Sequence, residues 1–436
     1  MRAARVLTIA VLTTGSAVCL PAASVAAVET CHGQPATHVG STGGGILFGT
    51  SGDDVVVSNG AGTVMTGAGN DLVCLTGTPL DGFVWVDVAA GDDTIDATVD
   101  QPTVHHVTAV LGAGADTYLG SPVKDIVYAQ DDSGTPEAVD EVATGAGGDD
   151  VTLGRKGTAT SDLVSLGEGD DKLDVRGLPG PGQLDGGPGA DTVLFSDKTE
   201  VSWLFDNRAQ TASADGRTMP VLGLEAFRVN LRRSPAVQFL GGRGPETLEI
   251  SQWADLPETE VDMGPGADQV VLVGPVLGGT FRGGRGADAV RISAYGVGVP
   301  ENTQGGADLR AHEVWLGYRR PRDHGQAVIR SFADVDLDHF GTVAVVGDGR
   351  DNDITVTACR ADVRAGGGDD VVRFQAFARR LCGPLPSRAT TADGEKGNDT
   401  LIGSLGWDTL LGGPGRDRAD GGKGVDTCVT EVRRRC

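Results

Sequence analysis

The sequence predicts an all-β protein, a parallel β-solenoid of the β-roll or β-helix kind, and three observations lead to that fold class. Glycine accounts for 68 of the 436 residues, a short glycine–aspartate motif recurs along most of the chain, and apolar and polar residues alternate between the motifs. Glycine weakens a helix interior by about 1 kcal/mol per residue, so this composition disfavours large helical domains. It favours a chain with many tight turns.

The motif is most regular near the C-terminus, in the stretch GEKGNDTLIGSLGWDTLLGGPGRDRADGGKGVDTCV. There the motif returns every nine residues, with glycine at Gly394, Gly403, Gly412 and Gly421 and aspartate at Asp399, Asp408, Asp417 and Asp426. Upstream, the acidic residues that close the motif are Asp54, Asp71, Asp93, Asp116, Asp150, Asp171, Asp191, Glu246, Asp268, Asp288, Asp308, Asp351 and Asp370. Nine of the thirteen intervals from the first of these to Asp399 span 17 to 23 residues. Repetition at such a period is the signature of a solenoid.

The residues between motifs carry the period of two that is typical of β-strands. In GPGADQVVLVGPVLGGTFRGGRGADAV, which begins at Gly264, a β-branched run follows the aspartate and a second apolar piece follows the turn-rich GPVLGG. The stretch FVWVDV from Phe83 alternates in the same way. Each unit of about 20 residues therefore predicts a turn, a strand, an opposite turn and a second strand. Such a unit buries its apolar face only against its neighbours, which predicts a right-handed stack of about nineteen coils, roughly 90 Å long.

The N-terminus has the layout of a secretory signal peptide. Two arginines precede an apolar run at residues 6–20, and the small residues of PAASVAA follow, with cleavage expected after Ala26 or Ala27. The run is too short to anchor the chain across a bilayer, and no other stretch is long and apolar enough to do so. Residues 1–27 are therefore expected to direct secretion.

Six cysteines follow residue 27, and an even number in an exported chain predicts disulfides. Sequence alone allows fifteen pairings of six cysteines. The pairs expected from proximity are Cys428–Cys436, Cys359–Cys382 and Cys31–Cys74. The first is the strongest expectation, because its members bracket the terminal CVTEVRRRC.

The chain is strongly acidic. Its formal net charge is −24, and loss of the two arginines in residues 1–27 makes it −26. Such a charge disfavours nucleic acid as a partner, because phosphates repel it, and favours cations. The absence of a long hydrophobic segment in the sequence disfavours membrane insertion.

The residue types of the motif select the kind of cation. Glycine admits positive φ and leaves backbone carbonyls uncrowded, and the closing aspartate adds a carboxylate. Hard oxygen donors in an irregular arrangement suit Ca²⁺ better than Mg²⁺, which needs near-ideal octahedral geometry. Soft metals are disfavoured because the motif contains neither cysteine nor histidine.

Stacking gives the carboxylates a further reason to bind cations. Successive coils bring equivalent aspartates to about 5 Å, where like charges repel each other unless a divalent cation lies between them. In the terminal block nine residues make half a coil, so Asp399 is expected to stack on Asp417 and Asp408 on Asp426, with sites on both edges. The longer units upstream are expected to carry sites mainly on one edge.

The motif resembles the nonapeptide G-G-x-G-x-D-x-U-x of the hemolysin-type calcium-binding repeats of RTX proteins, in which U is apolar. GGPGADTVL from Gly186 and GGPGRDRAD from Gly412 match its G-G-x-G-x-D core in full. The resemblance covers residues 49–429. With the N-terminal signal, the terminal cysteine pair and 30 Arg against 6 Lys, the chain also resembles secreted actinobacterial members of that family.

The resemblance implies a β-roll in which early backbone carbonyls of the turn and the sixth-position aspartate hold Ca²⁺ between coils. The aspartates so implied are Asp54, Asp71, Asp93, Asp116, Asp150, Asp171, Asp191, Asp268, Asp288, Asp308, Asp351, Asp370, Asp399, Asp408, Asp417 and Asp426. The glycines so implied are Gly394, Gly397, Gly403, Gly406, Gly412, Gly413, Gly415, Gly421, Gly422 and Gly424. In VGDGRDND either Asp351 or Asp353 is the ligand, and in GGRGPETLE the pair Pro245 and Glu246 departs from the motif.

Catalysis is not expected, although parallel β-helices include polysaccharide lyases, epimerases and hydrolases. A polysaccharide-acting enzyme that carries these repeats is therefore the alternative function. The sequence contains no HExxH pair, no G-x-S-x-G elbow and no P-loop, and AHEVW has Leu316 where a second histidine would stand. Paired acids such as Asp53 and Asp54 belong to the repeat and need no catalytic role.

The expected organisation is a signal peptide at residues 1–27, an N-terminal cap region at 28–48, a degenerate repeat solenoid at 49–393, tandem nonapeptides at 394–429 and a C-terminal cap at 430–436. The expected function is that of a secreted, monomeric calcium-binding protein with a structural or extracellular binding role. Its further partner is a cell-wall glycan or an extracellular protein. Segment 192–240 lacks the motif but still alternates, and is where a partner surface is expected.

Overall fold

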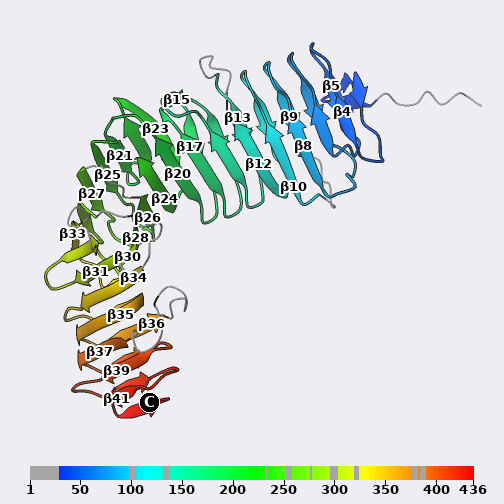
Figure 1. Cartoon of the computed structure of the whole chain (residues 1–436). Coiled ribbons are helices and arrows are strands. Elements are labelled where there is room, and N and C mark those ends of the chain that lie inside the picture. The colour runs from blue at the N-terminus through cyan, green and yellow to red at the C-terminus, as the bar shows by residue number, and fades with distance from the viewer. Residues whose placement is uncertain are drawn as a thin grey trace, which may run out of the picture.

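The part of the chain that the structure describes consists of strands and turns, without a helix. The computed structural model describes residues 29–98, 104–130, 138–231, 233–251, 258–274, 277–294, 303–318, 324–375, 382 and 389–436. The strands stack coil upon coil along a bent rod (Figure 1). The predicted all-β fold and its parallel solenoid are confirmed. The predicted signal peptide at residues 1–27 lies outside the described residues.

Two stacks of short strands form the walls of the solenoid, and we call them face 1 and face 2. Face 1 begins with β3 (His38–Val39), β5 (Val55–Val57), β7 (Leu72–Cys74), β9 (Thr94–Asp96), β11 (Thr117–Leu119), β13 (Glu141–Ala143), β16 (Leu163–Ser165), β19 (Gln183–Asp185) and β23 (Arg217–Leu222). It continues with β22 (Thr211–Ala214), β21 (Trp203–Asp206), β25 (Ala236–Leu240), β27 (Glu258–Asp262), β29 (Thr280–Arg282), β33 (His324–Arg330), β32 (Glu313–Tyr318) and β31 (Thr303–Asp308). In the last coils it contains β37 (Ala389–Lys396), β39 (Trp407–Leu411) and β41 (Thr427–Val429).

Face 2 is parallel throughout. Its strands are β4 (Ile46–Phe48), β6 (Thr63–Met65), β8 (Phe83–Asp87), β10 (His106–Val110), β12 (Lys124–Ala129), β14 (Asp150–Leu153), β17 (Lys172–Arg176), β20 (Thr192–Asp197), β24 (Ala226–Leu231), β26 (Thr247–Ser251), β28 (Gln269–Val273), β30 (Ala289–Ser293), β36 (Val371–Gln375), β38 (Thr400–Ile402), β40 (Arg418–Asp420) and β42 (Val432–Arg434). The long strands β34 (Asp334–Val346) and β35 (Asp353–Gly367) run through face 2 and then face 1. Outside the faces, β1 (Thr30–Cys31) pairs with β2 (Gln34–Pro35), and β15 (Ala159–Thr160) with β18 (Leu178–Pro179).

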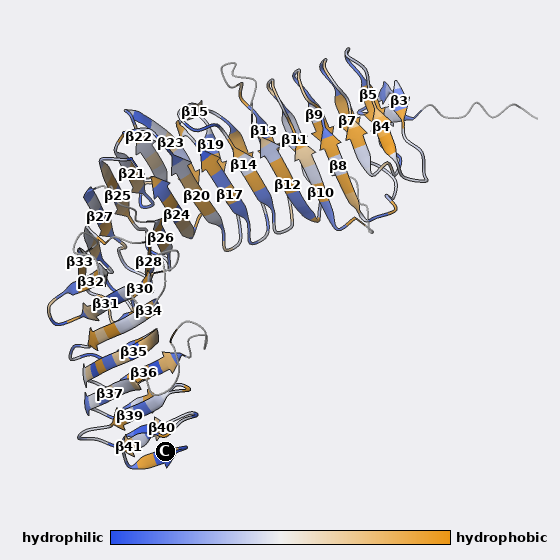
Figure 2. Ribbon diagram, in the orientation of Figure 1, coloured by the Kyte–Doolittle hydropathy of each residue, from blue (hydrophilic) through white to orange (hydrophobic). Residues whose placement is uncertain are grey.

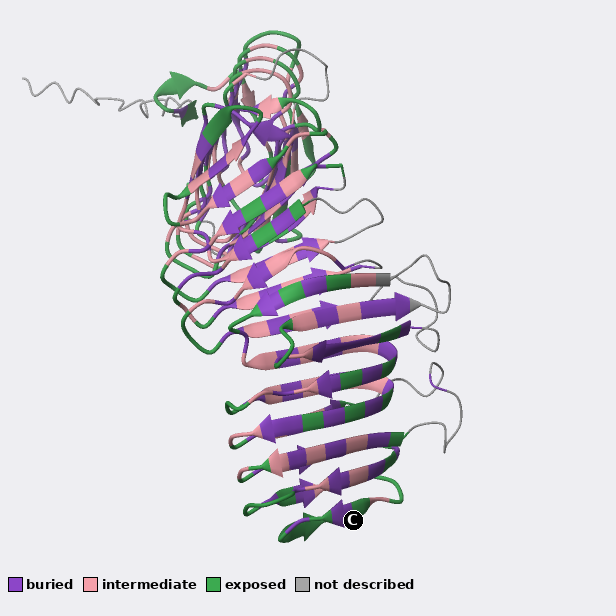
Figure 3. Cartoon of the chain, turned by 90° about the vertical axis from the view of Figure 1, so that its left-hand side faces the viewer, coloured by how far each residue is buried: buried purple, intermediate pink, exposed green. Residues whose placement is uncertain are grey.

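A thin apolar core fills the space between the faces. Alternate side chains of each strand point inward, as the period of two predicts, and pair in register with the next coil. One such row on face 1 is Val56, Val73, Ile95, Tyr118, Val142, Val164 and Leu184, all buried. Figure 2 shows hydrophobic and hydrophilic positions alternating along the strands, and Figure 3 shows the matching alternation of buried and exposed positions.

The rod bends where face 1 has more strands than face 2. Strands β21, β22 and β23 form an antiparallel meander within face 1, while β20 pairs directly with β24 on face 2. Strands β31, β32 and β33 do the same, while β30 pairs directly with β34. Each meander adds two strands, so face 1 gains roughly 19 Å of length in all at about 4.8 Å per strand. Face 1 accordingly lies on the outer side of the bend (Figure 1).

All three expected disulfide pairs are present: Cys31–Cys74, Cys359–Cys382 and Cys428–Cys436. The first joins the N-terminal strands to β7, and the last closes the C-terminal end of the stack. The predicted boundary between residues 393 and 394 falls within β37, which pairs with both β35 and β39. The stack therefore continues through that point without interruption.

Candidate metal sites at the turns

Each motif turn ends in a residue that lies directly before, or at the start of, a strand. We define edge 1 as the side of the solenoid on which the chain turns from face 2 into face 1. Edge 2 is the opposite side, on which the chain turns from face 1 into face 2. The acidic residues of edge 1 are Asp54, Asp71, Asp93, Asp116, Asp140 and Asp162, and in the last coils Asp408 and Asp426. Those of edge 2 are Asp125, Asp149, Asp171, Asp191, Glu225, Glu246, Asp268, Asp288, Asp370, Asp399, Asp417 and Glu431.

The acidic side chains form ladders from coil to coil. The backbone N–H of one acidic residue donates to a carboxylate oxygen of its equivalent in the next coil, as from Asp71 to Asp93 at 2.7 Å. The expected stacking of Asp399 on Asp417 is confirmed by such a bond at 2.9 Å. A third example, from Asp408 to Asp426 at 3.0 Å, confirms the second expected pair. In the aspartate ladders the accepting atom is Oδ1.

The other carboxylate oxygen, Oδ2, is buried without a hydrogen-bond partner in eleven of these aspartates. The eleven residues are only 0–2% exposed. They are Asp71, Asp93, Asp116, Asp149, Asp171, Asp191, Asp268, Asp288, Asp370, Asp399 and Asp417. A buried polar group without a partner destabilises the fold by about 1–3 kcal/mol, and a charged group by more. A row of eleven such oxygens is therefore costly to leave ionised unless a proton or a cation neutralises it.

Two glycines of the turn that ends at Asp417 leave no room for a side chain. A Cβ atom on Gly412, at the first position, would lie 2.4 Å from Oδ2 of Asp417 and would displace the carboxylate. A Cβ atom on Gly415, at the fourth position, would lie 1.6 Å from the carbonyl oxygen of Gly397 in the preceding coil. Successive turns thus stack backbone against backbone, with glycine carbonyls and carboxylates gathered in one row. The predicted glycines of the last coils lie in these turns.

Burial raises the pKa of the stacked carboxyls. It is the largest cause at Asp93, where the hydrogen bond from Asp71 opposes it, neighbouring aspartates add to it, and the pKa rises to about 7. The same balance raises the pKa of Asp116 to about 8 and that of Asp370 to about 7. These groups hold protons near neutral pH, and a cation that binds them must displace those protons.

The donor set fits calcium. The atoms gathered at each turn are carboxylate and carbonyl oxygens, which are the ligands of hard cations. The turns carry no thiolate or imidazole that a soft metal would need. Once their protons are displaced, the carboxylates with buried, unpartnered Oδ2 atoms supply the negative charge.

The ladders change edge along the chain. Edge 1 carries acids from Asp54 to Asp162 and again at Asp408 and Asp426, and edge 2 carries them from Asp125 onward, so the two overlap. The expectation that the upstream units carry acids mainly on one edge is therefore wrong. Each coil has two turns, one on each edge, between similar short strands. The motif can therefore move from one turn to the other without changing the alternation of inward and outward side chains along the strands.

The structure places Asp149, instead of the predicted Asp150, in the ladder. The N–H of Asp149 donates to Asp171 at 2.7 Å, and the Asp149 Oδ1 accepts from the N–H of Asp125. Asp150 starts β14 with its side chain turned outward, where it pairs with Lys124 and with Lys172. In the sequence GGDD either acid can close the motif, and the alternation of the strand selects the inward one.

Asp308, another predicted ligand, lies at the end of β31 away from both ladders. Its carboxylate accepts from the N–H of Ala311 at 2.8 Å within the β31–β32 turn. The glycines before it serve packing in an extended strand, since a Cβ atom on Gly306 would lie 2.2 Å from the Trp315 ring. The motif-like TQGGAD is therefore a strand of the meander.

At VGDGRDND the ladder position is occupied by Asn352, between the two predicted alternatives. Its N–H donates to Asp370 Oδ1 at 2.8 Å, and its side chain is buried. Asp351 is exposed and accepts from the N–H of Asp369, while Asp353 lies in β35 and pairs with Arg373. A motif defined by its acidic residue does not point to an asparagine, which carries no charge.

Sequence reasoning missed further ladder members. Asp125, Asp140 and Asp162 join the ladders although the residues before them lack the G-G-x-G pattern. Glu225 and Glu431 accept from Asp191 and Asp417, because the longer glutamate side chain bridges an irregular coil. The only feature of the sequence that points to these residues is an acidic residue directly before a stretch of alternating apolar and polar residues.

A second, outer ladder runs beside the first. The residue before the acid accepts through its side chain from the backbone N–H of its equivalent one coil later, as Asp53 does from Asn70 and Asp92 from Ala115. These side chains are exposed. The frequent pairing of two acids in the motif thus reflects one inner and one outer ladder, and it needs no catalytic explanation.

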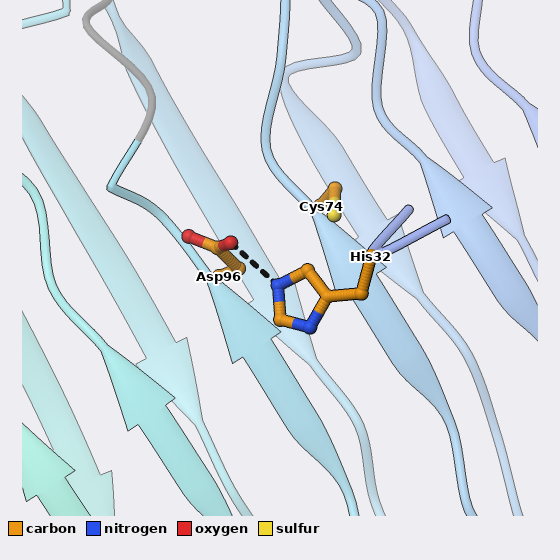
Figure 4. A group of neighbouring side chains, drawn as sticks. All are labelled: His32, Cys74 and Asp96. Carbon is orange, nitrogen blue, oxygen red and sulfur yellow. Dashed lines mark hydrogen bonds and ion pairs between the residues drawn. The ribbon is translucent and has the colours of Figure 1, made fainter. Parts of the chain in front are cut away.

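One compact group of metal-type side chains lies outside the turns, at the N-terminal end. The Nε2 atom of His32 lies 2.7 Å from a carboxylate oxygen of Asp96, beside Cys74 (Figure 4). Cys74 is bonded to Cys31, so its sulfur is not a thiolate and offers no metal ligand. The group is a hydrogen-bonded histidine–aspartate pair beside a disulfide.

No protein-family model matches the chain, and no curated protein is significantly similar to it. Among the described residues, no helix is long and apolar enough to cross a membrane.

Proposed function

We propose that this chain is a secreted calcium-binding protein whose solenoid is held together by Ca²⁺ between its stacked turns. The observation that carries the proposal is the row of eleven buried Oδ2 atoms without a partner. The resemblance of the motif to hemolysin-type calcium-binding repeats supports the same function, as does the signal-peptide layout of residues 1–27.

Calcium would act on stability through linkage. The ladder exists only in the folded stack, so an ion that binds there stabilises the folded state and leaves the unfolded chain unaffected. At low cytoplasmic calcium the crowded carboxylates would oppose folding before export. Outside the cell, affinities of about 10⁻⁴–10⁻³ M, typical of extracellular modules, would be sufficient.

The test is a calcium titration of the mature chain followed by circular dichroism and thermal melting. We expect a large rise in melting temperature with Ca²⁺ and a loss of strand signal with a chelator. Mg²⁺ at the same concentration serves as the control and should have a much smaller effect, because the irregular oxygen set does not suit it. An unchanged melting temperature with and without chelator would overturn the proposal.

A cleft next to the first meander, formed by β21, β22 and β23, is a candidate surface for a partner. A cleft of about 740 Å³ lies between the β21–β22 turn and the edge-2 turns, and Arg208, Arg243 and Arg285 line it. Arg208 is held by Asp262 and by the carbonyl of Gly241. Arg243 and Arg285 are exposed and sit at equivalent positions two coils, or about 10 Å, apart.

We therefore propose an acidic polysaccharide as the partner at this cleft, in a structural or binding role without catalysis. Guanidinium groups bind carboxylate and sulfate in a bidentate manner, and a regular spacing suits a polymer with repeated charges. Binding of polygalacturonate should be lost in a variant with Arg243→Ala and Arg285→Ala and retained with Arg418→Ala on β40. Turnover of the polymer would instead favour the polysaccharide-acting enzyme.

A further inference from the structure

Seventeen ladder turns, the sixteen that carry the motif and the turn that ends at Asp125, fall into two conformational classes that differ at the residue four positions before the ladder residue. In twelve turns this residue has positive φ, from 62° at Ala89 to 118° at Gly366. We call these the open turns, and the twelve residues are Gly67, Ala89, Gly112, Gly145, Gly167, Gly187, Gly264, Gly284, Gly366, Glu395, Gly413 and Gly422. In the remaining five, the self-capped turns, φ is not positive, and the residues are Thr50, Ser121, Gly242, Asp348 and Ser404.

The two classes treat the ladder side chain differently. In every self-capped turn the backbone N–H of this residue donates to the ladder side chain, as from Thr50 to Asp54 and from Ser404 to Asp408, both at 2.6 Å. The other three bonds run from Ser121 to Asp125, from Gly242 to Glu246 and from Asp348 to Asn352. All eleven unpartnered Oδ2 atoms belong to open turns, where the left-handed backbone directs this N–H elsewhere.

Self-capped turns occupy a particular place in the stack. Each is the first in an uninterrupted series of ladder turns on one edge, and we call such a series a run. One coil before Asp54, Asp125, Glu246, Asn352 and Asp408, the strand register places Ala36, Val107, Glu225, Ala333 and Thr390 respectively. None of these five follows a G-G-x-G turn. Every open turn, in contrast, follows another of the seventeen turns on the same edge one coil earlier.

We propose that the ladder side chain at the first turn of each run is not a calcium ligand, because the backbone N–H of its own turn already occupies it, and that calcium is bound by the carboxylates of the open turns. The inference rests on the calcium binding proposed above. It removes Asp54 and Asp408 from the expected ligands, although both match the motif in sequence. It assigns calcium to the twelve open turns.

The side chains at the starts of runs support this assignment independently. Asn352 is uncharged and fully satisfied, since its Oδ1 accepts from the N–H of Asp348 and its Nδ2 donates to the Ala333 carbonyl at 2.8 Å. At Glu246 the amide of Asn207, from the inserted meander, donates to the carboxylate. These side chains receive donors beyond the ladder bond, whereas the Oδ2 atoms of eleven open-turn aspartates receive none.

The test compares two variants of neighbouring buried aspartates in the mature, full-length chain. Native mass spectrometry would count bound Ca²⁺ ions per chain in the parent, in Asp408→Asn and in Asp417→Asn. Asp408→Asn should keep the parental number of ions, because Asn352 shows that an amide fits the start of a run. Asp417→Asn should bind one ion fewer, because it removes the charge of an open turn.

A second pair at the other end of the rod, Asp54→Asn and Asp71→Asn, repeats the comparison if a C-terminal variant fails to fold. Equal loss of one ion in both members of a pair, or no loss in either, would overturn the inference while leaving calcium binding intact. A parent chain that binds no calcium would overturn the proposed function as well.

Discussion

The backbone N–H of Asp93 donates to Oδ1 of Asp116 at 2.8 Å, while Oδ2 of each aspartate lies buried with no partner. The bond orients one carboxylate towards the preceding coil. It leaves the charge of that carboxylate uncompensated in an apolar setting. The ladder therefore fixes the register between coils, but it destabilises the stack unless a proton or a cation neutralises the carboxylates.

Replacing one ladder carboxylate should accordingly have opposite effects with and without calcium. At pH 9, above the raised pKa of Asp116, Asp116→Asn keeps the acceptor for the N–H of Asp93 and removes a buried charge. We expect the variant to melt higher than the parent in chelator, by the equivalent of about 1–3 kcal/mol, and lower than the parent in saturating calcium. Asp150→Asn, on the outer surface, is the control and should leave the calcium-induced shift unchanged. A variant that is less stable in both conditions would contradict this expectation.

The pH dependence of the calcium-free protein follows from the raised pKa values. A carboxyl whose pKa rises from 3.8 to about 7, as at Asp93, or about 8, as at Asp116, binds its proton more tightly in the folded state. Its contribution to stability is complete below about pH 3.8 and is lost as the pH rises through about 6–8. In chelator the melting temperature should therefore fall between pH 5 and pH 8. In calcium the fall should be much smaller, because the ion replaces the proton. Equal melting temperatures at both pH values in chelator would refute the expectation.

The fold class and disulfide pairs were predictable because they depend on period and proximity. The ladder members were less so, as Asp149 shows: GGDD contains two acids, and only the strand alternation distinguishes them. Asn352 is not predicted by a motif defined by charge, because the start of a ladder needs an oxygen acceptor and not a carboxylate. The meanders could not be foreseen, since TQGGAD carries the turn motif but is extended beneath Trp315. Such choices depend on contacts distant in sequence.

The close stacking of the turns predicts a sharp difference between two fourth-position glycines. A Cβ atom on Gly415 would lie 1.6 Å from the carbonyl oxygen of Gly397, whereas one on Gly244 would meet nothing within 4 Å. Gly415→Ala should destabilise the chain by about 3 kcal/mol, at the upper end of the range for overpacking, because backbone and not a flexible side chain must move. Gly244→Ala should change stability by less than about 0.5 kcal/mol. Thermal unfolding of both variants in saturating calcium makes the comparison, and equal stabilities would contradict the stacking.

The two terminal disulfides should differ in their effect on stability. Cys31–Cys74 closes a loop with a sequence separation of 43, and Cys428–Cys436 one of 8. Loop-closure entropy assigns about 4 kcal/mol to the first and about 2.5 kcal/mol to the second. Replacing both cysteines of a pair by alanine should therefore lower the denaturation midpoint more at the N-terminus than at the C-terminus. Removing Cys31–Cys74 should also free the N-terminal strands from β7, which increased amide exchange in residues 29–39 would reveal. A larger loss from the C-terminal pair would mean that end closure of the stack outweighs loop length.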